Sequence, residues 1–193
     1  MVRKNVPRGT SPDKRRGTVA PDALVERALV AFVKSGTIEL SLDQLAKRVG
    51  ASKRMLVHYF GGREELEERA MRRLEDRLRA QFSPGAFPQG VSVKTVLTTL
   101  WERTTAPGAK GVLRLLMDLS RRAWNGSARA QAFYAEQQRL WVQLLRNFLP
   151  DQTRVEELLQ LFQGAVVAYL ISNDPEPGRR ALTRFVSRTR RSP

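Results

Sequence analysis

The side chains best suited to a chemical task lie between Ser41 and Phe60, where Ser52, Lys53 and Arg54 open a short amphipathic segment. Lysine and arginine near the start of a helix can donate hydrogen bonds to the O6 and N7 atoms of guanine in a DNA major groove. Contact with phosphate oxygens alone, without sequence reading, is the alternative for both side chains. These residue types indicate nucleic-acid binding, provided that a suitable element presents them.

Two short helices around a glycine turn would present them. Apolar residues recur at helical spacing on both sides of Gly50, at Leu42, Leu45, Ala46, Val49, Leu56, Tyr59 and Phe60. Steeply crossing helices need a small side chain where they touch, a corner residue that tolerates positive φ, and an apolar anchor. Ala46, Gly50 and Leu56 meet these needs. The pattern predicts a helix-turn-helix at residues 41–60, and the alternative is a structural helical hairpin.

Helices are also predicted on either side of this motif. The first begins at Pro21 and ends at Gly36, and Ser41 and Ser52 should cap the second and third. A connector helix at 63–81 carries its glutamates first and its arginines last, in the order that the helix dipole favours. Such an order suits a helix that joins two domains.

The remainder of the chain also reads as helical. A Ser, Pro and Gly-rich break covers residues 83–90. The helical segments predicted after it are 91–105, 111–124, 128–149, 153–172 and 178–189. Because no alternating strand pattern or internal repeat accompanies them, the predicted fold is all-α with about nine helices.

Composition narrows the function classes. The chain has 193 residues, with 34 basic and 19 acidic side chains, and its net charge of +15 favours polyanions, meaning DNA or an acidic membrane surface. The absence of cysteine excludes disulfides and thiolate metal sites. The sequence contains no run of about 18 apolar residues, so no membrane span is predicted, and no secretion signal is recognised. A cytoplasmic location is therefore expected. With a single histidine, no metal-ligand cluster, no nucleophile elbow and no phosphate loop, we expect no enzyme, metal or cofactor.

The first 19 residues form a separate basic segment. They are rich in Arg, Lys, Pro and Gly and nearly devoid of apolar side chains, which predicts a disordered arm in the free protein. The arm could lie in a DNA minor groove, or it could be a solvated tail that adds general charge attraction.

The segments ALVERALVAFVKSG and SLDQLAKRVGASKRMLVHYFGGREEL resemble the N-terminal domain of TetR-family transcriptional regulators. The resemblance runs from about Leu24 to Leu66 and includes Phe32, Gly36, Leu45, Ala46, Gly50, Ser52, Lys53, Leu56, His58, Tyr59, Phe60 and Glu65. It implies a homodimeric, all-helical regulator, usually a repressor that a small molecule releases from DNA. It also implies a helix-turn-helix DNA-binding domain at 20–66 and a ligand-binding and dimerisation domain at 67–193.

The candidate DNA-binding residues are Ser41, Ser52, Lys53, Arg54, Met55, Val57, His58, Tyr59 and Arg63. By resemblance, positions 53–55 and 57 approach bases, whereas Ser41, His58 and Arg63 touch phosphate. For His58, the alternative is a half-buried packing role. Met55 replaces a small hydroxyl residue and Val57 a tyrosine found in many members, so contact with thymine methyl groups is the expected substitute.

An effector pocket and a dimer interface are further implications of the resemblance. The large side chains that could line a pocket, or simply form core, are Trp101, Met117, Trp124, Phe133, Tyr134 and Trp141. Glu102 or Asp118, if buried without a partner, could recruit a cationic ligand. The candidate dimer residues are Leu158, Phe162, Ala165, Tyr169 and Phe185. The arginine-rich end at 179–191 is either a solvated face or a second contact with a polyanion.

Together these observations favour a dimeric transcriptional regulator whose partners are a double-stranded DNA operator, a second copy of the chain and a small-molecule effector. The alternative is a basic architectural protein that binds DNA without sequence preference or ligand control. A further alternative is a membrane-surface protein.

Overall fold

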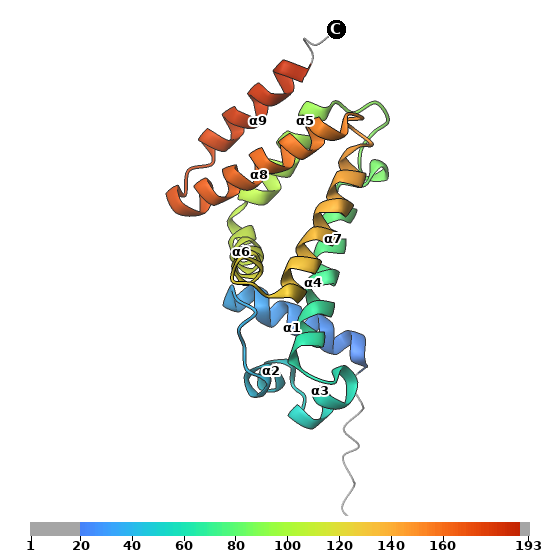
Figure 1. The fold of residues 1–193 in the computed structure, drawn as a ribbon, viewed down its shortest axis with the longest axis vertical. Coiled ribbons are helices and arrows are strands. Elements are labelled where there is room, and N and C mark those ends of the chain that lie inside the picture. Colours follow the sequence, from blue (N-terminus) through green and yellow to red (C-terminus); the bar gives the residue numbers. More distant parts are fainter. Residues whose placement is uncertain (1–19, 190–193) are drawn as a thin grey trace, which may run out of the picture.

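The computed structural model describes residues 20–189, and the predicted N-terminal arm at 1–19 lies outside the described residues. The described part contains nine α-helices, two short 3-10 helices and no strand (Figure 1). The predicted all-α fold is therefore confirmed.

The helices follow the sequence pattern closely. They are α1 (Pro21–Ser35), α2 (Leu42–Val49), α3 (Lys53–Phe60), α4 (Arg63–Ala80), α5 (Val93–Thr105), α6 (Lys110–Trp124), α7 (Ala128–Leu145), α8 (Gln152–Ser172) and α9 (Glu176–Thr189), with 3-10 helices η1 (Pro84–Ala86) and η2 (Pro107–Ala109). The helix predicted at 128–149 ends earlier, at Leu145. There the N–H groups of Asn147 and Phe148 bond three residues back, and this tighter winding ends α7 before Pro150.

Local caps fix the ends of the helices in the DNA-binding region. The Ser41 hydroxyl accepts a hydrogen bond from the Gln44 N–H (3.1 Å), and the Gln44 side-chain oxygen accepts one from the Ser41 N–H (2.9 Å). The Ser52 hydroxyl caps α3 by accepting from the Met55 N–H. Gly50 ends α2 at φ +69°, a value that favours glycine.

A first hydrophobic core lies beneath the three N-terminal helices. Its fully buried side chains include Leu24, Phe32, Leu45, Leu56 and Leu66 from α1 to α4. The same cluster takes in one buried side chain from α6, Leu115, and one from α7, Phe133, and the partly buried Val112, Leu116 and Leu119 of α6 pack against it. The N-terminal helices therefore pack directly on the helices that follow the break at 83–90.

A second hydrophobic core holds α5, α8 and α9 together. Trp101 lies at its centre, 1% exposed, and its Nε1 donates to the Pro175 carbonyl at 3.0 Å. A Cβ at Gly178 would lie 2.4 Å from the Trp101 ring, so only glycine lets α9 approach this closely. Figure 1 shows α9 beside α8 at the end of the molecule opposite α2 and α3.

Helix α8 is, by length and composition alone, apolar enough to cross a membrane, and no other described helix is. Its Val155, Leu158, Val166 and Tyr169 are buried in the second core. A core helix passes the same test of length and hydropathy, so this feature does not identify a membrane span.

Candidate nucleic-acid interface

Helix α3 presents one face to solvent and fastens the other to the first core. Leu56 is fully buried and Phe60 is 4% exposed, and these two side chains anchor the helix. The outward positions of the helix are exposed, as the spacing predicts. They are Ser52, Lys53, Arg54, Val57 and His58. Met55 is half-buried at the flank, and Tyr59 is half-buried against the core. Because the caps and the core fix the helix, the outward side chains are presented in a fixed direction.

The two basic residues at the start of α3 differ in their surroundings. Lys53 Nζ lies 3.1 Å from Asp43 Oδ2, and both side chains are more than half exposed. An ion pair this exposed contributes little, about 0–1 kcal/mol, and a phosphate can replace it. Arg54 has no hydrogen bond or ion pair among residues 20–189 and is exposed. Arg54 is therefore the side chain freest to reach a base.

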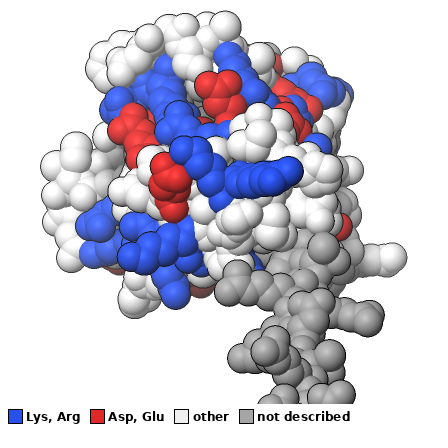
Figure 2. Space-filling view, turned by 90° about the horizontal axis from the view of Figure 1, so that it is seen from below, with Lys and Arg blue, Asp and Glu red and all other residues white. Residues whose placement is uncertain are grey.

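Helix α2 adds basic side chains that the sequence analysis did not include. Lys47 and Arg48 are exposed in its last turn and, within the described chain, have no polar partner. Arg27 of α1 donates to the Val49 carbonyl at 3.0 Å and so holds the end of α2. Seen from this end of the molecule, Lys and Arg side chains gather in patches over the surface (Figure 2). The sequence signal for Lys47 and Arg48 was their position in the last turn of a helix inside the predicted motif.

His58 and Arg63, both candidates for phosphate contact, have different positions. His58 is exposed, which removes the half-buried packing role as its alternative. Arg63 Nη1 donates to the Leu40 carbonyl at 3.4 Å, and its Nε lies 3.2 Å from Glu67 Oε1. Arg63 thus ties the start of α4 to the loop before α2, and in this structure its contacts are internal.

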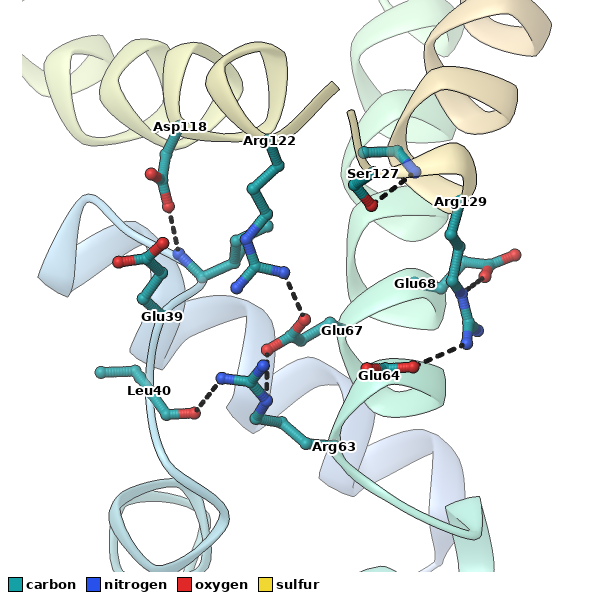
Figure 3. A network of polar contacts seen from close by, with 12 residues as sticks. Glu39, Leu40, Arg63, Glu64, Glu67, Glu68, Asp118, Arg122, Ser127 and Arg129 are labelled. Carbon is teal, nitrogen blue, oxygen red and sulfur yellow. Dashed lines mark hydrogen bonds and ion pairs between the residues drawn. The ribbon is translucent and has the colours of Figure 1, made fainter. Parts of the chain in front are cut away.

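Helix α6 is fastened to that same loop by Asp118 (Figure 3). The carboxylate accepts a hydrogen bond from Thr37 Oγ1 at 2.7 Å and one from the Ile38 N–H at 3.1 Å. Burial raises the pKa of Asp118, but the hydrogen bonds from Thr37, Arg121 and Ile38 outweigh it and leave the pKa below its usual value. Asp118 is therefore a charged, fully partnered group, and it does not offer a site for a cationic ligand.

Glu67 connects α4 with α6 from a buried position. Its side chain is 6% exposed and lies between Arg63 (3.2 Å) and Arg122 of α6 (2.9 Å). Burial raises the pKa of Glu67, and the two guanidinium groups oppose that effect. The group is a buried charge held by one arginine on each side, so removing either arginine should be costly.

A ladder of polar contacts joins α4 to α7 along most of their length. Arg129 pairs with Glu65 at 3.0 Å. It also pairs with Glu68 and, at 3.7 Å, with Glu64, as Figure 3 shows. Further along, Arg72 pairs with Glu136 at 2.6 Å. The remaining contacts run from Arg79 to Gln137 and from Trp141 Nε1 to Glu75 at 3.0 Å. A shift of α7 would therefore be transmitted to α4.

The large side chains predicted to line a pocket do not come together. Trp101 lies in the second core, Phe133 in the first, and Met117 is half-buried on α6. Trp124 is 85% exposed at the end of α6, and Trp141 is bonded to Glu75. Large apolar residues mark helix faces, and the sequence does not say which core each face enters.

A cleft of about 520 Å³ lies elsewhere, between α7 and α8. Tyr134 lines it, and it is the one pocket candidate from the sequence that does. The other lining residues include Arg139, Val142, Arg146 and Leu159. Glu102, the second carboxylate considered for a cationic ligand, is exposed and pairs with Arg179 at 3.4 Å.

The candidate dimer residues fall largely on the inner side of α8. Leu158 is 2% exposed and Tyr169 5% exposed, both within the second core, and the Tyr169 hydroxyl donates to the Thr105 carbonyl. Phe162, Ala165 and Phe185 are half-buried against the same core. The wide apolar stripe of α8 thus serves mainly the protomer's own interior. Its exposed line consists of Gly164, Val167, Ala168 and Ile171.

The family model described as "Bacterial regulatory proteins, tetR family" matches residues 24–70, which cover most of α1, all of α2 and α3, and the first part of α4. The predicted TetR resemblance of the N-terminal region is therefore confirmed. No curated protein sequence matches the chain.

Solved structures share the fold over most of the chain. A transcriptional regulator from Rhodococcus sp. Rha1 is similar with a TM-score of 0.73 and 20% identity, over 88% of this chain and 95% of that one. A TetR-family transcriptional regulator from Streptomyces coelicolor is similar with a TM-score of 0.66 and 20% identity, over 85% of this chain and 77% of that one. The fold is that of TetR-family transcriptional regulators.

Proposed function

We propose that this protein is a cytoplasmic, sequence-specific DNA-binding regulator that represses transcription as a homodimer on a palindromic operator until a small-molecule effector releases it. The observation that carries the proposal is the outward face of α3. There Arg54, Val57 and His58 are exposed, while Leu56 and Phe60 hold the helix on its core. A guanidinium and an apolar side chain on one rigid helix can read guanine and thymine, respectively, in a major groove.

The exposed line of α8 supports the homodimer. Ile171 is 83% exposed and Val167 42% exposed, and Gly164 and Ala168 lie beside them at helical spacing. Large apolar side chains gathered on one exposed helix face commonly mark a protein interface. Small residues beside them let a second helix approach closely. A second copy of the chain would supply that helix and place two α3 helices on one DNA duplex.

Two structural features support control by an effector. The cleft between α7 and α8 has a volume in the range of small-molecule sites, about 300–1,000 Å³. The ladder between α4 and α7 and the contacts of Asp118 and Glu67 link that part of the molecule to the DNA-binding helices. An effector that binds one arrangement of these helices better than another would shift the spacing of the two α3 helices. We assign DNA binding to residues 20–66 and effector binding and dimerisation to 67–193, with 63–81 as connector.

The test compares Arg54→Ala with Lys34→Ala, which removes the same charge from an exposed position in the last turn of α1. Both variants would be titrated on a fragment that the wild type selects from genomic DNA and on a scrambled fragment. Loss of a bidentate base contact costs about 1–3 kcal/mol, so Arg54→Ala should weaken binding to the selected fragment roughly tenfold to a hundredfold. Binding to the scrambled fragment should change far less.

Equal losses on the two fragments would contradict the base-reading role of Arg54. If the wild type also fails to prefer any fragment at near-physiological salt, the architectural alternative replaces the regulator. Lys53 and Arg54 would then be phosphate contacts.

A further inference from the structure

Helix α9 carries an exposed line of arginines that the proposed operator contact does not use. Arg180, Arg184 and Arg188 are spaced by four residues, so they follow one another along the helix at intervals of about 6 Å. Leu182 and Val186, on the opposite side of the helix, are buried in the second core. The arginines therefore point away from the protomer.

These three guanidinium groups have no compensating charge. None of them has a hydrogen bond or an ion pair within residues 20–189, and no carboxylate occurs between Pro177 and Thr189. By contrast, Arg179 of the same helix pairs with Glu102 and Glu176. Like charges four residues apart destabilise a helix slightly, and an anion bound along the line would remove that cost.

The chemistry between the arginines favours phosphate over a lipid surface or a protein. The exposed positions among them are Thr183 and Ser187, whose hydroxyls donate to the carbonyls of Arg179 and Thr183 at 2.8 and 3.0 Å. The guanidinium groups are therefore the donors on this face that remain for phosphate oxygens. A helix that lies in a membrane surface needs an exposed apolar face, and the apolar side of α9 is buried. The apolar line that suits a protein partner is on α8.

We propose that the α9 arginine line binds the phosphate backbone of a second DNA duplex, so that the protein bridges two DNA segments. Helix α9 lies at the end of the molecule opposite α2 and α3 (Figure 1), and a duplex bound there would not compete with one bound at α3. This contact needs no sequence preference, because phosphate carries none. It adds a function that operator binding by α3 does not provide.

The test uses the full-length protein on tethered DNA. A duplex carrying a fragment selected by the wild type is fixed to beads and saturated with protein, excess protein is removed, and capture of a labelled duplex without that fragment is measured. We expect the wild type to capture it and the variant R180Q/R184Q/R188Q to capture at least tenfold less. The salt slope of log affinity for the second duplex should fall by about 2.7, because each phosphate that is no longer neutralised lowers the slope by about 0.9.

The charge control is K34Q/R114Q, compared with R180Q/R184Q, which removes the same charge from α9. Lys34 and Arg114 are exposed and have no polar partner in residues 20–189. K34Q/R114Q should capture the second duplex like the wild type, and R180Q/R184Q should capture less. Affinity for the tethered duplex, measured first and separately, should stay within twofold for all of these variants. If the wild type shows no sequence preference, any duplex that it binds can be tethered instead. The bridging assay can therefore still be run when the regulator proposal fails, and the two failures remain distinguishable.

Three results would overturn the bridging proposal. The first is undiminished capture by R180Q/R184Q/R188Q. The second is a change of oligomeric state in that variant, measured by light scattering, which would make the arginine line a protein contact. The third is that R180Q/R184Q/R188Q loses binding to vesicles with anionic lipid but captures DNA like the wild type. That result would assign the arginine line to a membrane surface.

Discussion

Arg54 and Val57 give α3 two different ways to distinguish bases. Arg54 is an unpartnered guanidinium and Val57 an apolar side chain that is 44% exposed, and both are on the face opposite Leu56. Arginine discriminates by hydrogen bonds to guanine, whereas valine can only contact the thymine methyl group. The two side chains therefore make separable predictions about the operator.

Val57→Ala tests the apolar part of this recognition. Replacing thymine by uracil in a selected fragment removes the C5 methyl group, and the wild type should then bind about fourfold more weakly, the value of one buried methyl group. Val57→Ala should bind the two fragments equally, because it has no side chain to reach the methyl group. A Val57→Ala protein that still discriminates thymine from uracil would contradict the contact.

Asp118→Asn tests the hydrogen bonds that hold the loop between α1 and α2. The pKa of Asp118 is lowered in the folded protein, so its contribution to stability is full above the pKa of the unfolded chain and is lost as pH falls through the lower, folded value. Asp118→Asn should therefore lower the free energy of unfolding at pH 7 by about 1–3 kcal/mol. The difference from the wild type should shrink in acid.

Urea titrations at neutral and acidic pH measure this difference. Glu157→Gln is the matched control, because Glu157 is an exposed carboxylate on α8 that has no hydrogen bond or ion pair in the described chain. It should change stability by less than about 0.5 kcal/mol. A pH-independent cost for Asp118→Asn would mean that its packing, not its charge, matters.

Residues with local partners could be predicted from the sequence, and residues with distant partners could not. Ser41 with Gln44 and Glu65 with Arg69 interact within one helical turn, so residue type and spacing identify them. Asp118 bonds to Thr37, which is 81 residues away, and no local pattern encodes that pair. Likewise, nothing in the sequence distinguished Lys53, paired with Asp43, from the unpartnered Arg54.

Among the helices that follow the break at 83–90, α6 packs most extensively on the DNA-binding region, through α1. A Cβ at Gly111 would lie 2.6 Å from the Val33 carbonyl oxygen, an atom of the α1 backbone that cannot move aside alone. Gly111 thus sets the distance between α6 and the end of α1, next to the loop that Asp118 holds. Any motion of α6 should reach α2 through this contact.

Gly111→Ala should force α6 and α1 apart. Overpacking of this kind costs about 1–3 kcal/mol, more than the gain of up to about 1 kcal/mol from replacing glycine within a helix. Gly108→Ala is the control, because a methyl group there meets nothing within 4 Å. Urea unfolding should show a loss for Gly111→Ala only. A stabilised Gly111→Ala protein would show that the two helices separate at no cost.

Helix identity was predictable, whereas the face that each helix buries was less so. Gly36, Gly50 and the serine caps give clear boundaries, because their effects act within a few residues. The apolar stripe of α8 is wide enough for a core and a partner, so the sequence did not show that Leu158 and Tyr169 lie within the protomer's own core. Trp124 was expected in a pocket and is exposed, because its position at a helix end removes it from both cores.

For the whole molecule, Val167→Glu tests the dimer. A carboxylate in the middle of the exposed apolar line of α8 would be buried without a partner in the proposed interface, so the variant should be monomeric by light scattering. The control is Val30→Glu on α1, where the native valine is 50% exposed against 42% for Val167. It should keep the oligomeric state of the wild type. The same state for both variants would place the interface elsewhere.

The most direct measurement is selection of genomic DNA fragments by the purified protein at near-physiological salt, followed by sequencing. If two α3 helices on a dimer read bases, the retained fragments should share a short palindrome whose half-sites lie about 34–36 Å apart. The motif should be lost with Arg54→Ala and kept with Lys34→Ala. Uniform retention without a motif would contradict sequence-specific regulation and leave a basic protein that binds DNA through phosphate alone.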